Sequence, residues 1–178
     1  MELDVDEAGF AGASQRTLSE ETMTDHAITV RLAEDADAEV VARLLDQFNR
    51  EFDEPSPGPA FLAARVVELI HTGETSVLLG GAGPDGVAVL RFRPSIWTSG
   101  AECYLAELYV TPDRRGNGVG RAIMNEALAH ARRRGADYMH IGVDEPDMPA
   151  RNLYESLGFV NRTGGPDGPL MFVYERDL

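Results

Sequence analysis

The chain has 178 residues, with 30 acidic and 16 basic side chains and a formal net charge of −14. A chain of this length is most simply one domain with a substantial core. The acidic balance disfavours nucleic acid and anionic membranes as partners, and we expect neither a membrane span nor a signal peptide.

The first half of the chain predicts strands around two helices. Residues 1–26 are acidic, poor in large apolar side chains and without clear period, so we expect a disordered or appended segment there and a domain over 27–178. The elements expected next are a strand over 27–32, a helix that Asp35 or Asp37 caps, a proline-rich loop over 54–59, a second helix that ends at Gly73, and strands over 75–79, 87–92 and 103–110.

The second half predicts a helix, a strand, a further helix and a last strand. Apolar residues recur every four positions from Val119 to Ala131, which is typical of a helix. Residues 137–143 alternate as in a strand, and Pro149 suits the first turn of a helix that stops at Gly158. The last strand is expected over 170–174. Periodicity alone therefore indicates a mixed α/β domain.

The number and spacing of cysteine and histidine residues limit which disulfides and metal sites the chain can form. The single cysteine, Cys103, excludes a disulfide framework and a cysteine-rich zinc site, and it suits a reducing compartment. The four histidines show no metal-ligand spacing. We expect a cytoplasmic protein without a metal, and the sequence leaves its oligomeric state open, a homodimer included.

The most informative stretch is residues 108–121, where an apolar strand leads through a proline turn into a glycine-rich loop and a helix. Glycines allow backbone N–H groups to converge on an anion, and the start of a helix adds free N–H donors and a positive dipole end. Arg114, Arg115 and Arg121 add positive charge. Residues 114–121, called the glycine loop below, are therefore predicted to bind phosphate.

Two common phosphate motifs do not fit the glycine loop. A P-loop needs a lysine, and this chain has none. The dinucleotide fingerprint G-x-G-x-x-G does not match the glycine spacing. The pattern R-x-x-G-x-G does match, at Arg115, Gly118 and Gly120, and residues 150–159 fit A-x-x-L-Y-x-x-x-G-F. With both motifs in this order, the chain resembles the GNAT superfamily of acetyl-coenzyme A (acetyl-CoA)-dependent N-acetyltransferases from about residue 29 onward.

The resemblance implies a single domain with the order β-α-α-β-β-β-α-β-α-β and a central mixed, mostly antiparallel sheet flanked by helices. In this family the strand before the glycine loop bulges and separates from the next strand, so that its backbone pairs with the pantetheine arm. The cofactor-binding residues that it implies are Leu108, Tyr109, Val110, Arg115, Gly116, Asn117, Gly118, Val119, Gly120, Arg121 and Asn152. For Asn152, helix capping or surface exposure is the alternative, and Asp147 can cap the same helix.

Two residues are candidates for proton transfer. Tyr154 aligns with the usual general acid of the family, and a phenol of pKa about 10 can donate to a thiolate whose conjugate acid lies near 8.5. Its alternative is a packing role. Glu107 is the base candidate, because it is two residues from both Leu105 and Tyr109 on the strand that lines the thioester, and we expect all three on one face. A solvent-facing or salt-bridged glutamate, or one that recruits a water, is the alternative.

The acceptor pocket follows from the same resemblance and is expected at Phe52, Asp53, Glu54, Arg91, Arg93 and Trp97. The acidic members would attract a cation, and the arginines could equally fix a carboxylate. The resemblance implies direct transfer without an acyl-enzyme, and the absence of G-x-S-x-G and of an evident Cys–His pair agrees with it. We therefore expect an acyltransferase that moves the acetyl group of acetyl-CoA to a primary amine of a small molecule. Acetylation of a protein or peptide, and a non-catalytic acyl-CoA-binding module, are the alternatives.

Overall fold

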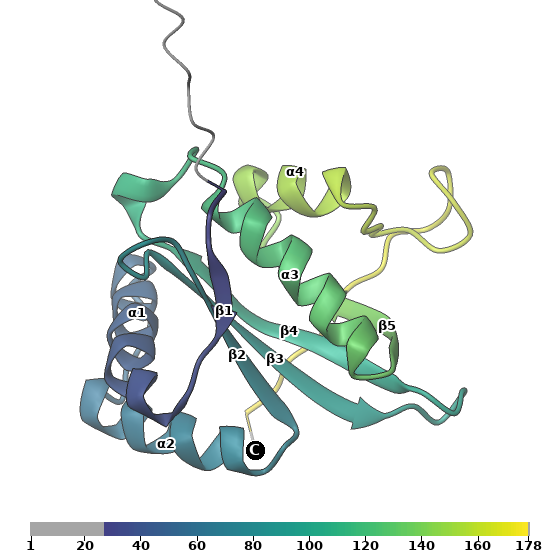
Figure 1. Ribbon diagram of the computed structural model, residues 1–178. Helices are drawn as coiled ribbons and strands as arrows, with labels where there is room; N and C mark the ends of the chain where they lie inside the picture. Colours follow the sequence, from purple (N-terminus) through teal and green to yellow (C-terminus); the bar gives the residue numbers. More distant parts are fainter. Residues whose placement is uncertain (1–26, 178) are drawn as a thin grey trace, which may run out of the picture.

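The structure is a computed structural model that describes residues 27–177, so the predicted segment 1–26 lies outside the described residues. Its strands form one sheet in the order β1-β2-β3-β4-β5, in which β4 and β5 are parallel and the other neighbours are antiparallel (Figure 1). This confirms the mixed, mostly antiparallel sheet. The strands are β1 (Val30–Leu32), β2 (Thr75–Gly80), β3 (Gly86–Pro94), β4 (Ala101–Val110) and β5 (Ala136–Ile141).

Helices cover both faces of the sheet. They are α1 (Ala38–Glu51), α2 (Pro59–His71), α3 (Val119–Arg133) and α4 (Met148–Ser156), with short 3-10 turns η1 (Asp35–Asp37) and η2 (Pro112–Arg114). One apolar cluster joins the sheet to α3 and α4 and includes the fully buried Leu90 and Ile123. The other joins it to α1 and α2 and includes Leu44. Each such side chain contributes about 1.5–3 kcal/mol on burial, and the two clusters hold β3 and β4 at the centre.

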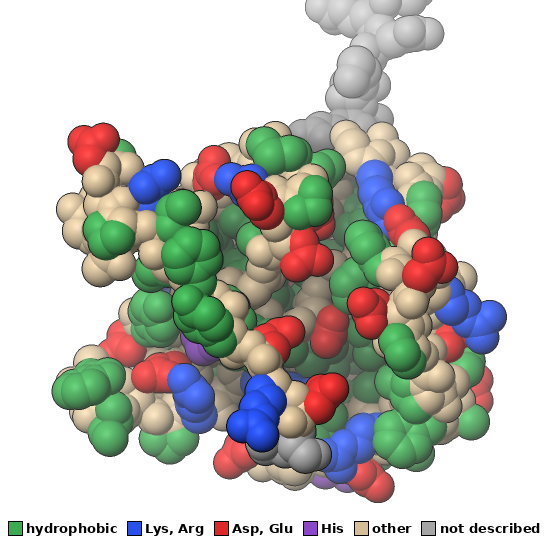
Figure 2. Space-filling view, turned by 180° about the vertical axis from the view of Figure 1, so that it is seen from behind, with side chains coloured by type: hydrophobic (Ala, Val, Ile, Leu, Met, Phe, Trp, Pro, Cys, Tyr) green, Lys and Arg blue, Asp and Glu red, His purple; other side chains and the backbone are tan. Residues whose placement is uncertain are grey.

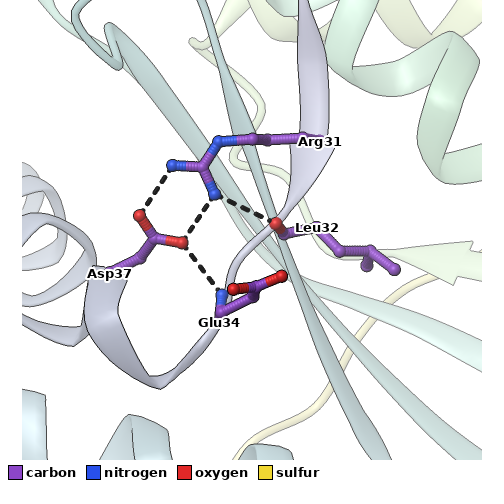
Figure 3. A network of polar contacts seen from close by, with 4 residues as sticks. All are labelled: Arg31, Leu32, Glu34 and Asp37. Atoms are coloured by element: carbon purple, nitrogen blue, oxygen red, sulfur yellow. Dashed lines mark hydrogen bonds and ion pairs between the residues drawn. The ribbon is translucent and has the colours of Figure 1, made fainter.

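The junction between β1 and α1 is fixed by Asp37 (Figure 3). The sequence places this residue correctly before α1, but its carboxylate does not cap that helix. Its oxygens instead accept hydrogen bonds from Arg31, both at 2.6 Å, and from the backbone N–H of Glu34 at 2.9 Å. The Arg31 bond, followed by the Glu34 bond, lowers the pKa of Asp37 to about 2.

The last predicted strand, over residues 170–174, is wrong. The structure has only an isolated antiparallel bridge between Arg162 and Leu170, made by the backbone bonds from Thr163 N to Pro169 O at 3.0 Å and from Met171 N to Asn161 O at 2.9 Å. A strand needs a partner along its whole length, and the short segment before the turn supplies one at only these points. The C-terminal segment crosses behind the sheet in Figure 1, on the side away from α3. In the described part of the chain, no helix is both long enough and apolar enough to cross a membrane.

Candidate active site

Strand β4 carries a β-bulge at Ala106. Along β3, Val89 faces Glu107, but the next residue of β3 faces Leu105, so Ala106 is an extra residue on β4. Pairing between β4 and β5 ends at the same point, after Leu105. Residues 106–110 therefore have a free edge on the β5 side, roughly 16 Å long at about 3.3 Å per residue. This is the bulged and separated strand that the resemblance implies.

The bulge changes which side chains share a face. Tyr109 belongs to the cluster under α1 and α2, and Glu107 pairs with Val89 of that same cluster. Leu105 belongs to the opposite cluster, under α3 and α4. The expectation that Leu105, Glu107 and Tyr109 share one face is therefore wrong for Leu105, because the extra residue resets the alternation of the strand.

The glycine loop ends in a run of unpaired backbone donors. Gly116 and Gly118 have φ of 76° and 83°, in the left-handed region that glycine adopts without strain. Gly118 is the N-cap of α3, and no side chain caps that helix. None of the backbone N–H groups of residues 116–121 donates a hydrogen bond to the described part of the chain. Successive free N–H groups at a helix start fit the acceptor oxygens of a pyrophosphate.

Arg115, which the resemblance assigns to the cofactor, is held by α1 in this structure. Its guanidinium donates to both carboxylate oxygens of Glu51, at 2.6 and 2.7 Å, and its Nε donates to the Val110 carbonyl at 2.9 Å. This pairing lowers the pKa of Glu51 and raises that of Arg115. The guanidinium also lies 5.6 Å from the ring centroid of Tyr109. Arg115 therefore ties the glycine loop to α1, and its charge is already balanced.

The other two arginines of the glycine loop differ in whether a carboxylate pairs with them. Arg114 forms an ion pair with Asp85 at 3.2 Å. Arg121 donates to the hydroxyl of Ser156 at 2.9 Å and has no carboxylate partner within residues 27–177. Of the three arginines that were expected to add positive charge, only Arg121 lacks a carboxylate partner within residues 27–177.

Tyr154 is buried in the cluster under α3 and α4. The helix that carries it is capped by Asp147, whose carboxylate accepts a hydrogen bond from Ala150 N at 3.1 Å, as expected. Burial, and then the charge of Asp147, raise the pKa of Tyr154 to about 12. That value lies roughly 3–4 pKa units above an ordinary thiol, so a hydrogen bond to a thiolate is favoured over full proton transfer. Asn152, on the same helix, is exposed.

Glu107 lies half-buried just beyond the bulge. Burial raises the pKa of its carboxyl, and the nearby charge of Arg91 opposes that shift. No ion pair joins Glu107 to a basic side chain of the described residues, which disagrees with the salt-bridged alternative. A carboxylate with a raised pKa is a better proton acceptor near neutral pH than an ordinary one.

The predicted acceptor residues fall in separate places. The segment 52–54 follows α1 directly, at the end of the sheet that bears the glycine loop, and its side chains are exposed. Arg93 lies toward the other end of β3, opposite Glu102 of β4. Trp97, in the β3–β4 loop, is 87% exposed. The strand between Glu102 and the end of β4 spans roughly 25 Å, so these residues do not form one pocket.

A cavity of about 170 Å³ lies beside Arg91, lined by Arg91, Phe92, Arg93, Tyr104 and His140. The rings of Tyr104 and His140 stack, with centroids 4.9 Å apart and planes at 18°. Sequence reasoning missed both residues, although the alternation that buries Met139 and Ile141 places His140 on the opposite face. Seen from behind in Figure 2, the molecule is hollowed near its middle, and Asp and Glu side chains surround the hollow.

Comparisons with known proteins agree with this geometry. Residues 39–159 match the model of the acetyltransferase (GNAT) family. The mycothiol acetyltransferase of Thermobispora bispora is 36% identical over 124 residues, which is 67% of this chain and 36% of that protein, so the match spans about a third of the relative's length. The uncharacterized N-acetyltransferase YhfO of Bacillus subtilis is 27% identical over 142 residues, 77% of this chain and 93% of that protein.

A solved structure supports the same assignment. A candidate acetyltransferase from Arthrobacter sp. FB24 superimposes with a TM-score of 0.77 and 42% identity, over 84% of this chain and 96% of that one. The sheet, the bulged strand and the glycine loop, together with these matches, define an acyl-transferring enzyme. The chain belongs to the GNAT family of acetyltransferases.

Proposed function

We propose that this enzyme transfers the acetyl group of acetyl-CoA directly to the primary amine of a small molecule. The observation that carries the proposal is the free edge of β4 over residues 106–110, because it runs from the unpaired carboxyl of Glu107 toward the free N–H groups of the glycine loop. The family uses acetyl-CoA as cosubstrate, and bound acetyl-CoA would supply an acetyl group activated as a thioester.

The residues fit that cosubstrate along its length. The N–H groups of residues 116–121 and the guanidinium of Arg121 would hold the pyrophosphate. The free edge of β4, at Leu108 and Tyr109, would pair with the amides of the pantetheine arm as an added strand does, and the exposed Asn152 of α4 would bond the same amides. A backbone N–H at this edge would stabilise negative charge on the thioester oxygen as it develops.

Two side chains would then handle the protons. Glu107 accepts the proton of the acceptor ammonium, which an alkylamine of pKa about 10 retains at neutral pH. The Tyr154 hydroxyl stays protonated, since its pKa is about 12, and donates a hydrogen bond to the departing thiolate. The thiolate then takes up the second proton that the nitrogen loses as the C–S bond breaks, and CoA leaves as the free thiol. Cys103 takes no part, because burial raises the pKa of its thiol to about 11 against the opposing charge of Arg134. Direct transfer is the course that these residues support.

The size of the cavity favours a small acceptor. At about 170 Å³ it is smaller than the 300–1,000 Å³ typical of drug-sized ligand sites. The name of the mycothiol acetyltransferase relative also points to an acceptor other than a protein, although the match covers 36% of that relative.

The test is the release of free CoA thiol from acetyl-CoA in the presence of a panel of small primary amines. We expect amine-dependent release and a product whose mass exceeds that of the amine by one acetyl group. Release that occurs only with a protein or peptide acceptor would favour the alternative acceptor class. Binding of acetyl-CoA without release under any condition would favour the non-catalytic module.

A further inference from the structure

Arg91 is an exposed arginine on the central strand β3 of an acidic molecule. It lies on β3, opposite Tyr104 of β4 and Thr75 of β2. Arg93, two residues further along the same strand, is paired with Glu102 at 2.7 Å. No carboxylate within residues 27–177 forms an ion pair with Arg91. Its guanidinium is therefore available to an anion from outside the chain.

His140 lies in the wall of the cavity beside Arg91. Nδ1 of His140 is buried and has no hydrogen-bond partner among the described residues. Burial, and then the charge of Arg93, lower the pKa of His140, so the ring is neutral at neutral pH, although Glu102 opposes the shift. A buried ring nitrogen without a partner carries a free-energy cost. The cavity thus presents the Arg91 guanidinium beside a neutral imidazole ring that stacks on Tyr104.

Glu107 supplies a negative charge near the positive charge of Arg91. Through Val89, its pairing partner, Glu107 lies on the face of the sheet that also bears Arg91, and the charge of Arg91 acts on its carboxyl. It has no ion-pair partner of its own among the described residues. A half-buried carboxyl and a free guanidinium on one face, close enough to interact but not paired, match the two ends of a zwitterion.

We propose that the acceptor is a small amino acid-like zwitterion, whose carboxylate binds Arg91 in the cavity and whose amino group points toward Glu107. This inference rests on the proposed function, since it names the class of amine acetylated at that site. Tyr104 and His140 form the wall of the carboxylate subsite. An amine without the carboxylate leaves Arg91 unpaired, so specificity arises from the bond between the carboxylate and Arg91.

The experiment compares matched acceptors that differ only in charge. Amino acids with one to five methylenes between the amino and carboxyl groups are each tested against their neutral carboxamides, with CoA release as the assay. We expect kcat/KM to be about 10- to 100-fold higher for the best acid than for its amide, as charge-assisted hydrogen bonds are the stronger kind. Arg91→Gln should reduce that ratio to within about threefold, and Arg91→Lys should keep part of it.

Two controls make the outcome decisive. Arg65→Gln removes the same charge from α2, where Arg65 pairs with Glu68, and should leave the ratio unchanged. If Arg91→Gln does not fold, inhibition of the wild-type enzyme by butyrate, competitive with the amine, is the expected substitute result. Equal kcat/KM for acid and amide in the wild type, or a ratio that survives Arg91→Gln, overturns the zwitterion and leaves amine acetylation standing. Transfer to no amine of the panel overturns both.

Discussion

Two glycines at the ends of α3 have similar backbone conformations but different surroundings, and they provide a matched test of the anion site. Gly118 precedes α3 with φ of 83°, and Gly135 follows it with φ of 78°. A side chain in the left-handed region costs an L-residue about 1–2 kcal/mol at either position. An added Cβ lies 3.4 Å from Cδ1 of Ile28 at Gly118 and meets nothing within 4 Å at Gly135.

Substitution of either glycine should therefore cost a similar backbone strain, whereas only substitution of Gly118 should weaken the binding of acetyl-CoA. Gly118→Leu and Gly135→Leu should each lower the Tm of the ligand-free protein by roughly 2–8 °C, because 1 kcal/mol corresponds to about 2–4 °C in a chain of this size. Acetyl-CoA at about 100 times its Kd stabilises the native state by about 2.7 kcal/mol, or roughly 5–11 °C. Gly135→Leu should keep this increase, and Gly118→Leu should lose most of it, since position 118 lies within the run of N–H groups that is expected to hold the pyrophosphate.

The assay is thermal denaturation followed by circular dichroism, for the wild type and both variants, with and without acetyl-CoA. An equal ligand-dependent increase in both variants would refute the assignment of the glycine loop as the pyrophosphate site. Should Gly118→Leu not fold, Gly118→Ala carries the same comparison with Gly135→Ala.

The remaining predictions concern the hydroxyl of Tyr154 and the carboxyls of Glu107 and Asp37. Tyr154→Phe should lower kcat about 10- to 100-fold and leave the affinity for acetyl-CoA within about threefold, if the hydroxyl acts in the transition state; wild-type turnover would make Tyr154 a packing residue. Glu107→Gln should slow transfer by roughly ten- to ten-thousand-fold and remove the acidic limb of the kcat/KM–pH profile, and a retained limb would point to a water as the base. Asp37 has a pKa of about 2, below its ordinary value, so its contribution is present above pH 4 and lost as the pH falls through 2. The partly exposed pair with Arg31 contributes about 0.2–1 kcal/mol, so Asp37→Asn should lower the Tm by up to about 4 °C at pH 7, and a difference that persists at pH 2 would contradict this origin.

The glycine loop and α4 are predictable from the sequence because their determinants are local. Gly118 is required by its own backbone conformation, and Asp147 caps the helix that begins one residue later. Both features depend on residues within a few positions of one another. The order of the elements along the chain is also partly predictable from local patterns, because short polar turns separate apolar segments with a clear period.

The geometry around β4 is not predictable in this way. A bulge at Ala106 depends on how β4 pairs with β3, and one extra residue moves Leu105 to the face opposite Glu107. The bond from Arg115 to Glu51 joins residues that are 64 positions apart, so no local pattern indicates it. The prediction of a last strand was wrong for a related reason. Residues 170–174 have β-propensity, but a strand also needs a partner strand, and local propensity does not provide one.

The distribution of charge is consistent with binding of an anionic cosubstrate and a cationic amine at the proposed site. A chain with a net charge of −14 has to bind a polyanion, yet carboxylates already balance Arg114 and Arg115 in its glycine loop. What remains for the phosphates is mostly a set of backbone dipoles, which attract an anion over a short range and add no net charge. The same acidic surface favours the approach of a cationic amine. Arg91 is exposed, forms no ion pair within residues 27–177 and lines the cavity, so it is the cation that the anionic group of the proposed acceptor would meet there.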